Sequence, residues 1–177
     1  MCDTNVSKNV VCICGVKNSG KTTYMKRLIR EFAELGYKVA AIKHDGHDFQ
    51  SDTTGTDSFQ YQEAGAYGTA VYSGYRLMLM KEMADVPLEN IISFYKEADI
   101  ILVEGLKNSS YPKIELVRKD ISTVPVSNPQ GRFLIVTDAD LSDQYGEVRG
   151  FEQIHEAVQM IQRYTPKKFS NLIHNSY

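Results

Sequence analysis

Short apolar runs alternate with amphipathic segments along this chain. The first run, Val10 to Cys14, is continuously apolar, which is typical of a strand buried on both faces of a sheet. After it, apolar side chains recur every three or four residues, which predicts a helix that ends at Gly36. Further strands are predicted over residues 37–44, 99–105, 113–118 and 132–138. Strands joined by crossover helices favour an α/β fold, with a mostly parallel β-sheet flanked by helices on both faces.

The remaining segments add shorter elements. Residues 68–82 contain two apolar runs around a turn at residues 73–75, which predicts a β-hairpin excursion. Helices are predicted over residues 59–66, 87–95 and 151–161, and long polar loops over residues 45–57 and 119–131. Without any internal linker, the pattern indicates one domain over residues 1–164 and a flexible tail over residues 165–177.

The composition is that of an ordinary globular domain. The chain has 177 residues, of which 42% are hydrophobic and 24% are charged. Its net charge of -2 gives no general attraction to nucleic acid or to an anionic membrane. No apolar run approaches the ~20 residues that span a bilayer, and the N-terminal segment is too polar for a secretory signal. These features predict a cytoplasmic protein that binds neither nucleic acid nor membrane.

The cysteines favour core positions over chemistry. Cys2 lies near the N-terminus, whereas Cys12 and Cys14 lie within the first apolar run. An odd number of cysteines with this placement fits a reducing compartment. Residues two apart share one face of a strand, so the pair is compatible with a metal site. Because no second matching pair exists in the sequence, we favour small core residues.

A phosphate-binding motif directly follows the first strand. Gly15, Gly20, Lys21 and Thr22 match the pattern G-x-x-x-x-G-K-[ST], between a predicted strand and a predicted helix. Glycines let the backbone turn its N–H groups inward, at a helix N-terminus whose dipole favours anions. The lysine supplies a mobile positive charge, and the threonine hydroxyl is a ligand for Mg²⁺. The motif predicts a P-loop NTPase fold that binds a nucleoside triphosphate.

Residues inside and beside the motif extend the set of cofactor-binding candidates. Lys17, Asn18, Ser19 and Thr23 belong to the segment that should surround the phosphates. Lys17 and Asn18 are equally compatible with a solvated loop. We therefore place the predicted phosphate contacts within residues 15–23, with Lys21 as the residue that acts on the reacting phosphates.

An acid on another strand completes the predicted magnesium site. Sites of this kind hold Mg²⁺ with a carboxylate at the end of a neighbouring strand, directly or through water. Glu104 follows four apolar residues and precedes Gly105, and a carboxylate there is costly unless it meets a cation. Asp99 lies at the opposite end of the same strand. Glu104 is therefore the predicted metal ligand, and an acid that simply emerges into solvent is the alternative.

The loop after the second strand is rich in functional groups. We expect that strand to adjoin the phosphate-loop strand, so that its loop lies over the γ-phosphate and supplies a second magnesium contact. The candidates are Lys43, His44, Asp45, His47, Asp48, Asp52, Asp57 and Ser58. A zinc or nickel site is one alternative, although His44 and His47 lack the i, i+4 spacing that would make it specific. A solvated loop of turn-forming residues is the other.

Three segments of the chain carry a resemblance when they are taken together. They are "GVKNSGKTT", "VAAIKHDGHDFQSDTTGTDSFQYQEAGA" and "DIILVEGLK". Together they resemble the molybdopterin-guanine dinucleotide biosynthesis protein B (MobB) family. Many unrelated NTPases share the phosphate loop, but K-H-D-x-H, D-x-x-G-T-D-S and V-E-G-x-K are specific in combination. The resemblance runs from about residue 10 to about residue 104 and continues more weakly to residue 138.

The resemblance implies a GTP-binding protein of molybdenum-cofactor assembly. It implies binding of GTP with Mg²⁺, weak GTPase activity and an adaptor role beside the guanylyltransferase that joins a guanylate to molybdopterin. Other implied partners are the molybdopterin cofactor, apo-molybdoenzymes and a second copy of the chain, which would form a homodimer through residues 70–80. The residues implied to bind the phosphates are Gly15, Gly20, Lys21 and Thr22, and Glu104 is implied on the metal side. Asp52 matches an acidic position of the family and is implied as a second metal-side and catalytic residue.

Recognition of guanine has no familiar motif in this chain. The usual N-K-x-D element, whose aspartate pairs with the N1 and N2 donors of guanine, is absent from the sequence. Asp138 ends the last predicted strand, where a base reader should lie, with Thr137 beside it. Asp138 is therefore either the acceptor of those two hydrogen bonds or a helix or turn cap. The choice of GTP over ATP rests on the resemblance.

Two other functional classes share this scaffold. One is an ATP-dependent small-molecule kinase or a ligase similar to dethiobiotin synthetase. Kinases usually bring clustered arginines over the transferred phosphoryl group, whereas Arg76, Arg118, Arg132 and Arg149 are scattered along this chain. The other class is a metallochaperone GTPase, which usually carries a histidine-rich tract, whereas this chain has four scattered histidines.

Overall fold

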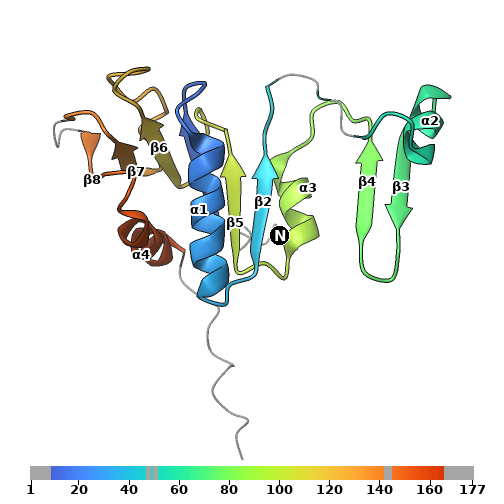
Figure 1. The fold of residues 1–177 in the computed structure, drawn as a ribbon, viewed down its shortest axis with the longest axis horizontal. Helices are drawn as coiled ribbons and strands as arrows, with labels where there is room; N and C mark the ends of the chain where they lie inside the picture. Colours follow the sequence, from blue (N-terminus) through green and yellow to red (C-terminus); the bar gives the residue numbers. More distant parts are fainter. Residues whose placement is uncertain (1–8, 47–48, 50–51, 142–144, 166–177) are drawn as a thin grey trace, which may run out of the picture. The chain divides into compact units, whose positions relative to one another are not determined.

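A six-stranded parallel sheet forms the centre of the larger part of the molecule (Figure 1). The computed structural model describes residues 9–46, 49, 52–141 and 145–165. The strands of this sheet are β1 (Val10–Gly15), β2 (Val39–Lys43), β5 (Ile100–Glu104), β6 (Lys113–Val117), β7 (Arg132–Thr137) and β8 (Val148–Arg149). Their order is β2-β5-β1-β6-β7-β8, and each neighbouring pair is parallel. The predicted parallel α/β sheet is confirmed, and β8 is a short edge strand that the sequence pattern does not predict.

One expectation about strand order is wrong. The strand β2 does not adjoin β1, because β5 lies between them and pairs with both. Residues 100–103 of β5 are at most 1% exposed, whereas Ala41 and Lys43 of β2 are exposed. A strand with two apolar faces suits the interior of a sheet, and a strand with exposed positions suits its edge. The neighbour of the phosphate-loop strand is therefore the strand that carries Glu104.

The helices α1 (Lys21–Glu34) and α4 (Ile154–Tyr164) pack on each other and on the same hydrophobic core (Figure 1). The buried side of α1 carries Tyr24, Met25, Leu28 and Phe32, at the three- and four-residue spacing that predicted it. Gly36 follows the helix with a φ of 79°, as expected for its C-terminal cap. Within the described ranges, no helix has the length and apolar content that crossing a bilayer requires.

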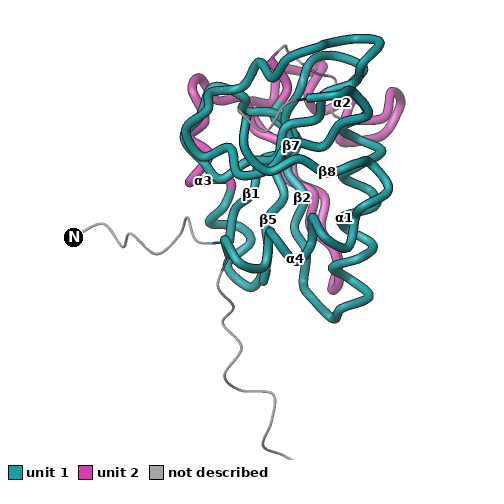
Figure 2. Tube along the Cα trace, turned by 90° about the vertical axis from the view of Figure 1, so that its left-hand side faces the viewer, with its two compact units in different colours: residues 1–44, 92–177 teal, residues 45–91 magenta. Residues whose placement is uncertain are grey.

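Residues 45–91 form a second compact unit, which Figure 2 distinguishes from the larger one. Its elements are α2 (Asp57–Glu63), β3 (Gly68–Tyr72), β4 (Leu77–Lys81) and most of α3 (Leu88–Ile92), and the short helix η1 (Ser93–Tyr95) follows in the larger unit. The predicted hairpin is confirmed, because β3 and β4 pair in antiparallel register with a turn at residues 73–76. The single domain over residues 1–164 stays a prediction, and residues 166–177 of the expected tail lie outside the described chain.

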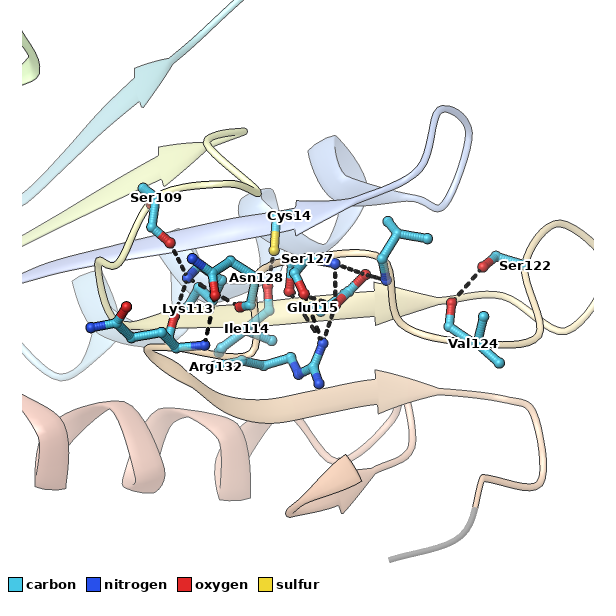
Figure 3. A network of polar contacts seen from close by, with 12 residues as sticks. Cys14, Ser109, Lys113, Ile114, Glu115, Ser122, Val124, Ser127, Asn128 and Arg132 are labelled. Carbon is cyan, nitrogen blue, oxygen red and sulfur yellow. Dashed lines mark hydrogen bonds and ion pairs between the residues drawn. The ribbon is translucent and has the colours of Figure 1, made fainter. Parts of the chain in front are cut away.

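A layer of buried charge lies on β6 (Figure 3). Lys113 is 0% exposed, and its ammonium donates to the carbonyl oxygens of Ser109 and Gln130 at 2.6 Å each and of Asn128 at 3.5 Å. These acceptors belong to the two loops, residues 105–112 and 118–131, that flank the strand. The single ammonium therefore ties both loops to the sheet.

Glu115 holds the second of these loops from the same strand. Its carboxylate accepts hydrogen bonds from Val126 N at 2.6 Å, from Ser127 N at 3.1 Å and from Ser127 Oγ at 2.6 Å. It also forms an ion pair with Arg132 at 3.1 Å, with the two side chains 1% and 9% exposed. Loops, rather than a helix, therefore cover this part of β6.

The two core cysteines lie close to this layer. Cys14 Sγ contacts Ile114 O at 3.4 Å, and both thiols are buried. Burial raises the pKa of Cys12 to about 11 and that of Cys14 to about 12. Both thiols are therefore protonated near neutral pH, which suits core residues better than metal ligands.

Removal of the Glu115 carboxylate should destabilise the protein strongly. The Glu115→Ala change removes the anionic partner of the Arg132 guanidinium and the acceptor of two backbone N–H groups. The loss from breaking a buried pair is about 3–5 kcal/mol of unfolding free energy. Urea denaturation measures this loss. The matched control is Glu147→Ala, which removes an exposed ion pair to Arg149 and should cost less than about 1 kcal/mol. Equal losses in the two variants would contradict the assigned role of Glu115.

Candidate functional site

The phosphate loop connects β1 to α1 at the carboxyl end of the sheet, with the strand–loop–helix context that the motif requires. Gly15 has a φ of 142°, and a Cβ atom on it would lie 2.5 Å from Leu116 O and 2.7 Å from Ser19 Oγ. Such distances exclude a side chain, so a glycine is needed where β1 passes β6. Asn18 and Gly20 also have positive φ values, of 65° and 89°. The backbone thus makes the tight turn for which the glycines were predicted.

The loop ends at the free N-terminus of α1. Gly20 is the N-cap and offers no side-chain acceptor to the first helical turn. Amides of a first turn have no carbonyl one turn earlier to bond, and they carry the positive end of the helix dipole. The Lys21 ammonium lies over the same loop, donating to Val16 O at 2.8 Å and to Gly15 O at 3.2 Å. Amides and ammonium together form a cradle suited to an anion.

Thr22 and Glu104 meet across neighbouring elements. Thr22 Oγ1 lies 3.0 Å from Glu104 Oε2 and 3.3 Å from Glu104 Oε1. The register of β1 with β5, in which Ile13 pairs with Glu104, places the acid there. Hydroxyl and carboxylate oxygens are ligands that Mg²⁺ prefers. The structure therefore brings together the two residues that the sequence predicted for the metal.

These two oxygen donors would need help from a ligand to complete a magnesium site. Among the described residues, no three His, Cys, Asp or Glu side chains lie together as an all-protein metal site requires. Mg²⁺ commonly keeps several waters and binds through one or two protein oxygens plus phosphate oxygens. The pair Thr22 and Glu104 fits that mode of binding.

The polar loop divides between the two compact units. Lys43 pairs in register with Glu104, and His44 N donates to Glu104 O at 2.9 Å, so both lie beside the acid in the larger unit. A Cβ atom on Gly105 would lie 3.0 Å from His44 O, which explains the glycine after the acid. Asp45, Asp52, Asp57 and Ser58 belong to the smaller unit, and His47 and Asp48 lie outside the described residues.

Asp52 makes local hydrogen bonds at the start of the smaller unit. Its carboxylate accepts from Thr53 N at 2.7 Å and from Thr56 Oγ1 at 3.3 Å, and it contacts Gln62 Nε2 at 3.4 Å. Hydrogen bonding from Ser58 and Thr53 lowers the pKa of Asp52. These contacts order the turn before α2, and the metal-side role of Asp52 stays a prediction.

Asp138 directly follows β7, and its carboxylate accepts hydrogen bonds from two donors. Its oxygens accept from Arg118 Nη1 and from Lys119 N, each at 2.9 Å. The Lys119 amide, with a smaller contribution from Arg118, lowers the pKa of the Asp138 carboxyl. Thr137 Oγ1 instead accepts from Ala139 N at 2.9 Å within its own turn. Asp138 is thus an ionised acceptor at the end of the strand where a base reader was predicted.

Arg118 is the residue near the phosphate loop that the sequence reasoning missed. It was counted among scattered arginines, yet its Nη2 lies 3.6 Å from the position that a Cβ atom on Gly20 would take. The available signal was its place directly after a core strand. That signal became informative only with the strand order, because β6 is the neighbour of β1.

The other loop candidates differ in exposure. Lys17 and Asn18 are exposed, as is Thr23 in the first turn of α1. Ser19 is 0% exposed, and within the described chain its Oγ has no hydrogen-bond partner. A buried hydroxyl without a partner carries a desolvation cost, and the role of Ser19 in phosphate binding stays a prediction.

Comparisons with known proteins agree with one another. A family model described as "Molybdopterin guanine dinucleotide synthesis protein B" matches residues 10–138. The molybdopterin-guanine dinucleotide biosynthesis adapter protein of Escherichia coli is 35% identical over 128 residues, which cover 70% of this chain and 73% of that protein. The probable adapter protein of Bacillus subtilis is 33% identical over 125 residues, 67% of this chain and 72% of that protein. The crystal structure of Bacillus subtilis MobB aligns with a TM-score of 0.71 at 26% identity, over 89% of this chain and 98% of that one.

Substitution of Glu104 should uncouple nucleotide binding from magnesium. The Glu104→Gln variant keeps the loop amides and Lys21, so it should still bind a triphosphate. Loss of the carboxylate charge should weaken the effect of Mg²⁺ on affinity by about tenfold or more. Titration with a fluorescent nucleotide, with and without Mg²⁺, measures both quantities.

The matched control for this measurement is Asp99→Asn. Its carboxylate accepts from Lys38 N at 2.7 Å at the opposite end of β5, so the change should leave the magnesium effect intact. If magnesium enhanced the affinity of the Glu104 variant as much as that of the unmodified protein, Glu104 would not be the metal-side acid.

Proposed function

The chain belongs to the molybdopterin guanine dinucleotide synthesis protein B family, and from this premise we propose that it is a GTP-binding adaptor of molybdenum-cofactor biosynthesis. It binds GTP with Mg²⁺, hydrolyses GTP slowly, and assists the guanylyltransferase that joins a guanylate to molybdopterin. Molybdopterin itself and apo-molybdoenzymes are further partners in this proposal. Its setting is the cytoplasm.

The observation that carries the nucleotide-binding part is the contact of Thr22 with Glu104 beside the phosphate loop. It joins a hydroxyl from the start of α1 to an acid from a neighbouring strand, next to the Lys21 ammonium. A triphosphate tail with a divalent cation needs these three groups together. A chance glycine-rich turn would not bring an acid to the same place.

Each residue then has a distinct task. Amides of residues 15–23 orient the phosphates, and Lys21 exchanges its loop carbonyls for β- and γ-phosphate oxygens. Thr22 and Glu104 hold the metal side, and a bound Mg²⁺ would neutralise charge that develops on the phosphates. Asp52 is a second metal-side residue by the family resemblance. Weak hydrolysis follows from a site that binds the triphosphate well but brings few groups to the γ-phosphate.

Guanine preference is assigned to Asp138. Its ionised carboxylate at the end of β7 is an acceptor of the kind that pairs with the N1 and N2 donors of guanine. The position of Arg132 argues against the kinase alternative. Arg132 is buried against Glu115, so it is not available for a lid over a transferred phosphoryl group.

In this proposal, two copies of the chain form a homodimer through the β3–β4 hairpin. Tyr72, Leu77 and Leu79 lie on one face of the β3–β4 ribbon and are 82%, 68% and 57% exposed. The other face meets α2, where Gln62 contacts Thr69 at 3.2 Å. A two-stranded ribbon is marginal by itself, and such an apolar face favours a protein partner. A second copy of the chain brings an identical ribbon to cover it.

A reconstituted synthesis tests the proposed function. Purified guanylyltransferase, molybdopterin and MgGTP are combined with and without the protein, and the dinucleotide product is quantified. We expect the protein to raise product yield and the Lys21→Ala variant to lose this effect, because the β- and γ-phosphate charges lose their cation. Lys26→Ala, an exposed change on α1, is the control and should act as the unmodified protein does.

Two results would contradict the proposal. One is equal stimulation by the Lys21 variant and the unmodified protein. The other is rapid ATP consumption that depends on an added small-molecule acceptor, which would indicate a kinase or ligase. Slow release of phosphate from GTP without any acceptor is the expected behaviour.

A charge on the open face of the hairpin should break the dimer. The Leu77→Asp and Leu79→Asp changes place a carboxylate in an apolar contact, which carries a large desolvation cost. We expect monomers by size-exclusion chromatography with light scattering. Tyr75→Asp, at the tip of the hairpin turn, adds the same charge outside this face and should leave a dimer. A dimer that survives both leucine changes would place the interface elsewhere.

A further inference from the structure

Arg118 lies between the phosphate loop and the assigned base reader. Its Nη1 donates to Asp138 Oδ2 at 2.9 Å. Its Nη2 lies 3.6 Å from the position that a Cβ atom on Gly20 would take. Its guanidinium carbon lies 3.6 Å from the centroid of the Phe151 ring. One planar cation therefore contacts a carboxylate and an aromatic face, and it lies beside the phosphate loop.

Phe151 is fixed to the helix that begins at the phosphate loop. Arg27 of α1 donates to Phe151 O at 2.7 Å and pairs with Glu152 at 3.1 Å. Tyr24 of the same helix meets the Phe151 ring edge-on, with centroids 6.1 Å apart. The Phe151 ring is therefore a preformed stacking surface beside the loop.

The contacts of Arg118 are those that a guanine base would make. Guanine presents coplanar N–H donors at N1 and N2, and a guanidinium presents the same kind of donors from a planar group. Both groups pair with a carboxylate, and both stack on an aromatic ring. The corresponding edge of adenine has an acceptor at N1, so adenine gains little from a carboxylate.

We propose that the Arg118 guanidinium is an internal competitor for guanine, which a guanine nucleotide displaces from the Asp138 carboxylate and the Phe151 ring. The inference rests on the GTP-binding function proposed above and extends it to recognition of the base. A guanine base must displace the guanidinium before it binds, and this step lowers the apparent affinity for the guanine nucleotide. Adenine does not use Asp138, so ATP binding does not bear the same cost. Arg118 is thus a specificity-determining residue that moderates the preference for guanine.

The ratio of ATP to GTP dissociation constants tests this inference. The two nucleotides carry identical phosphates, so any effect of the Arg118 charge on phosphate binding cancels in the ratio. Only guanine must displace the partly exposed ion pair with Asp138, so its loss should raise the preference for GTP up to about fivefold in Arg118→Ala. The cation–π contact with Phe151 is displaced by either stacked base, so its loss cancels in the ratio. Fluorescence titrations of both nucleotides with Mg²⁺ measure the ratio for each protein.

Three further variants make the measurement specific. Arg30→Ala removes a positive charge from the exposed side of α1 and should leave the ratio unchanged. Arg118→Lys keeps the charge without the planar group and should raise the ratio by less than the alanine change. Asp138→Asn should reduce the preference for GTP whether or not Arg118 is present. Thermal unfolding of each variant verifies that it is folded.

The outcomes separate this inference from the function on which it rests. An unchanged or lower ratio in folded Arg118→Ala, with GTP still preferred by the unmodified protein, would overturn the inference and leave the proposed function standing. Equal losses of GTP and ATP affinity would do the same and identify Arg118 as a phosphate ligand. An unmodified protein that bound neither triphosphate would overturn the proposed function itself.

Discussion

The parallel pairing of β1 with β5 on one side and β6 on the other determines the geometry of the candidate site. On the β5 side, the register opposite Ile13 brings Glu104 to within 3.0 Å of Thr22. On the β6 side, Gly15 pairs with Leu116, so the chain that leaves β6 passes the phosphate loop. The acid and Arg118 therefore reach the loop from opposite flanks. Neither position depends on a flexible connection, because Glu104 is the last residue of β5 and Arg118 directly follows the buried strand β6.

Local pattern was enough to predict the central strand, the phosphate loop, α1 and the hairpin, because each carries its signal within a few residues. Strand order was not predictable in the same way. The separation of β1 from β2 depends on which strand has two apolar faces to bury, and that is a comparison between distant segments. The importance of Arg118 is hidden for the same reason, since it depends on β6 lying beside β1.

The strand β6 shows a second limit of pattern. Its alternation of charged and apolar residues is typical of a strand with one face in solvent. In the structure both faces are buried, because loops cover the side that carries Lys113 and Glu115. Loops bring many backbone polar groups that need partners away from water. The two charged side chains supply those partners. Apart from Ser109, the partner groups lie 11 to 17 residues away along the chain, which is too far for a local pattern to reveal.

The smaller unit enters the chain between β2 and β5, which are direct neighbours in the sheet. An excursion between two paired strands can grow or shrink at little entropic cost, since each doubling of a flexible loop adds only about 0.6 kcal/mol to its closure. The strands that position Gly15, Glu104 and Arg118 all belong to the larger unit. Insertions and deletions within the excursion would therefore change its length without altering the strand pairing that fixes these three residues.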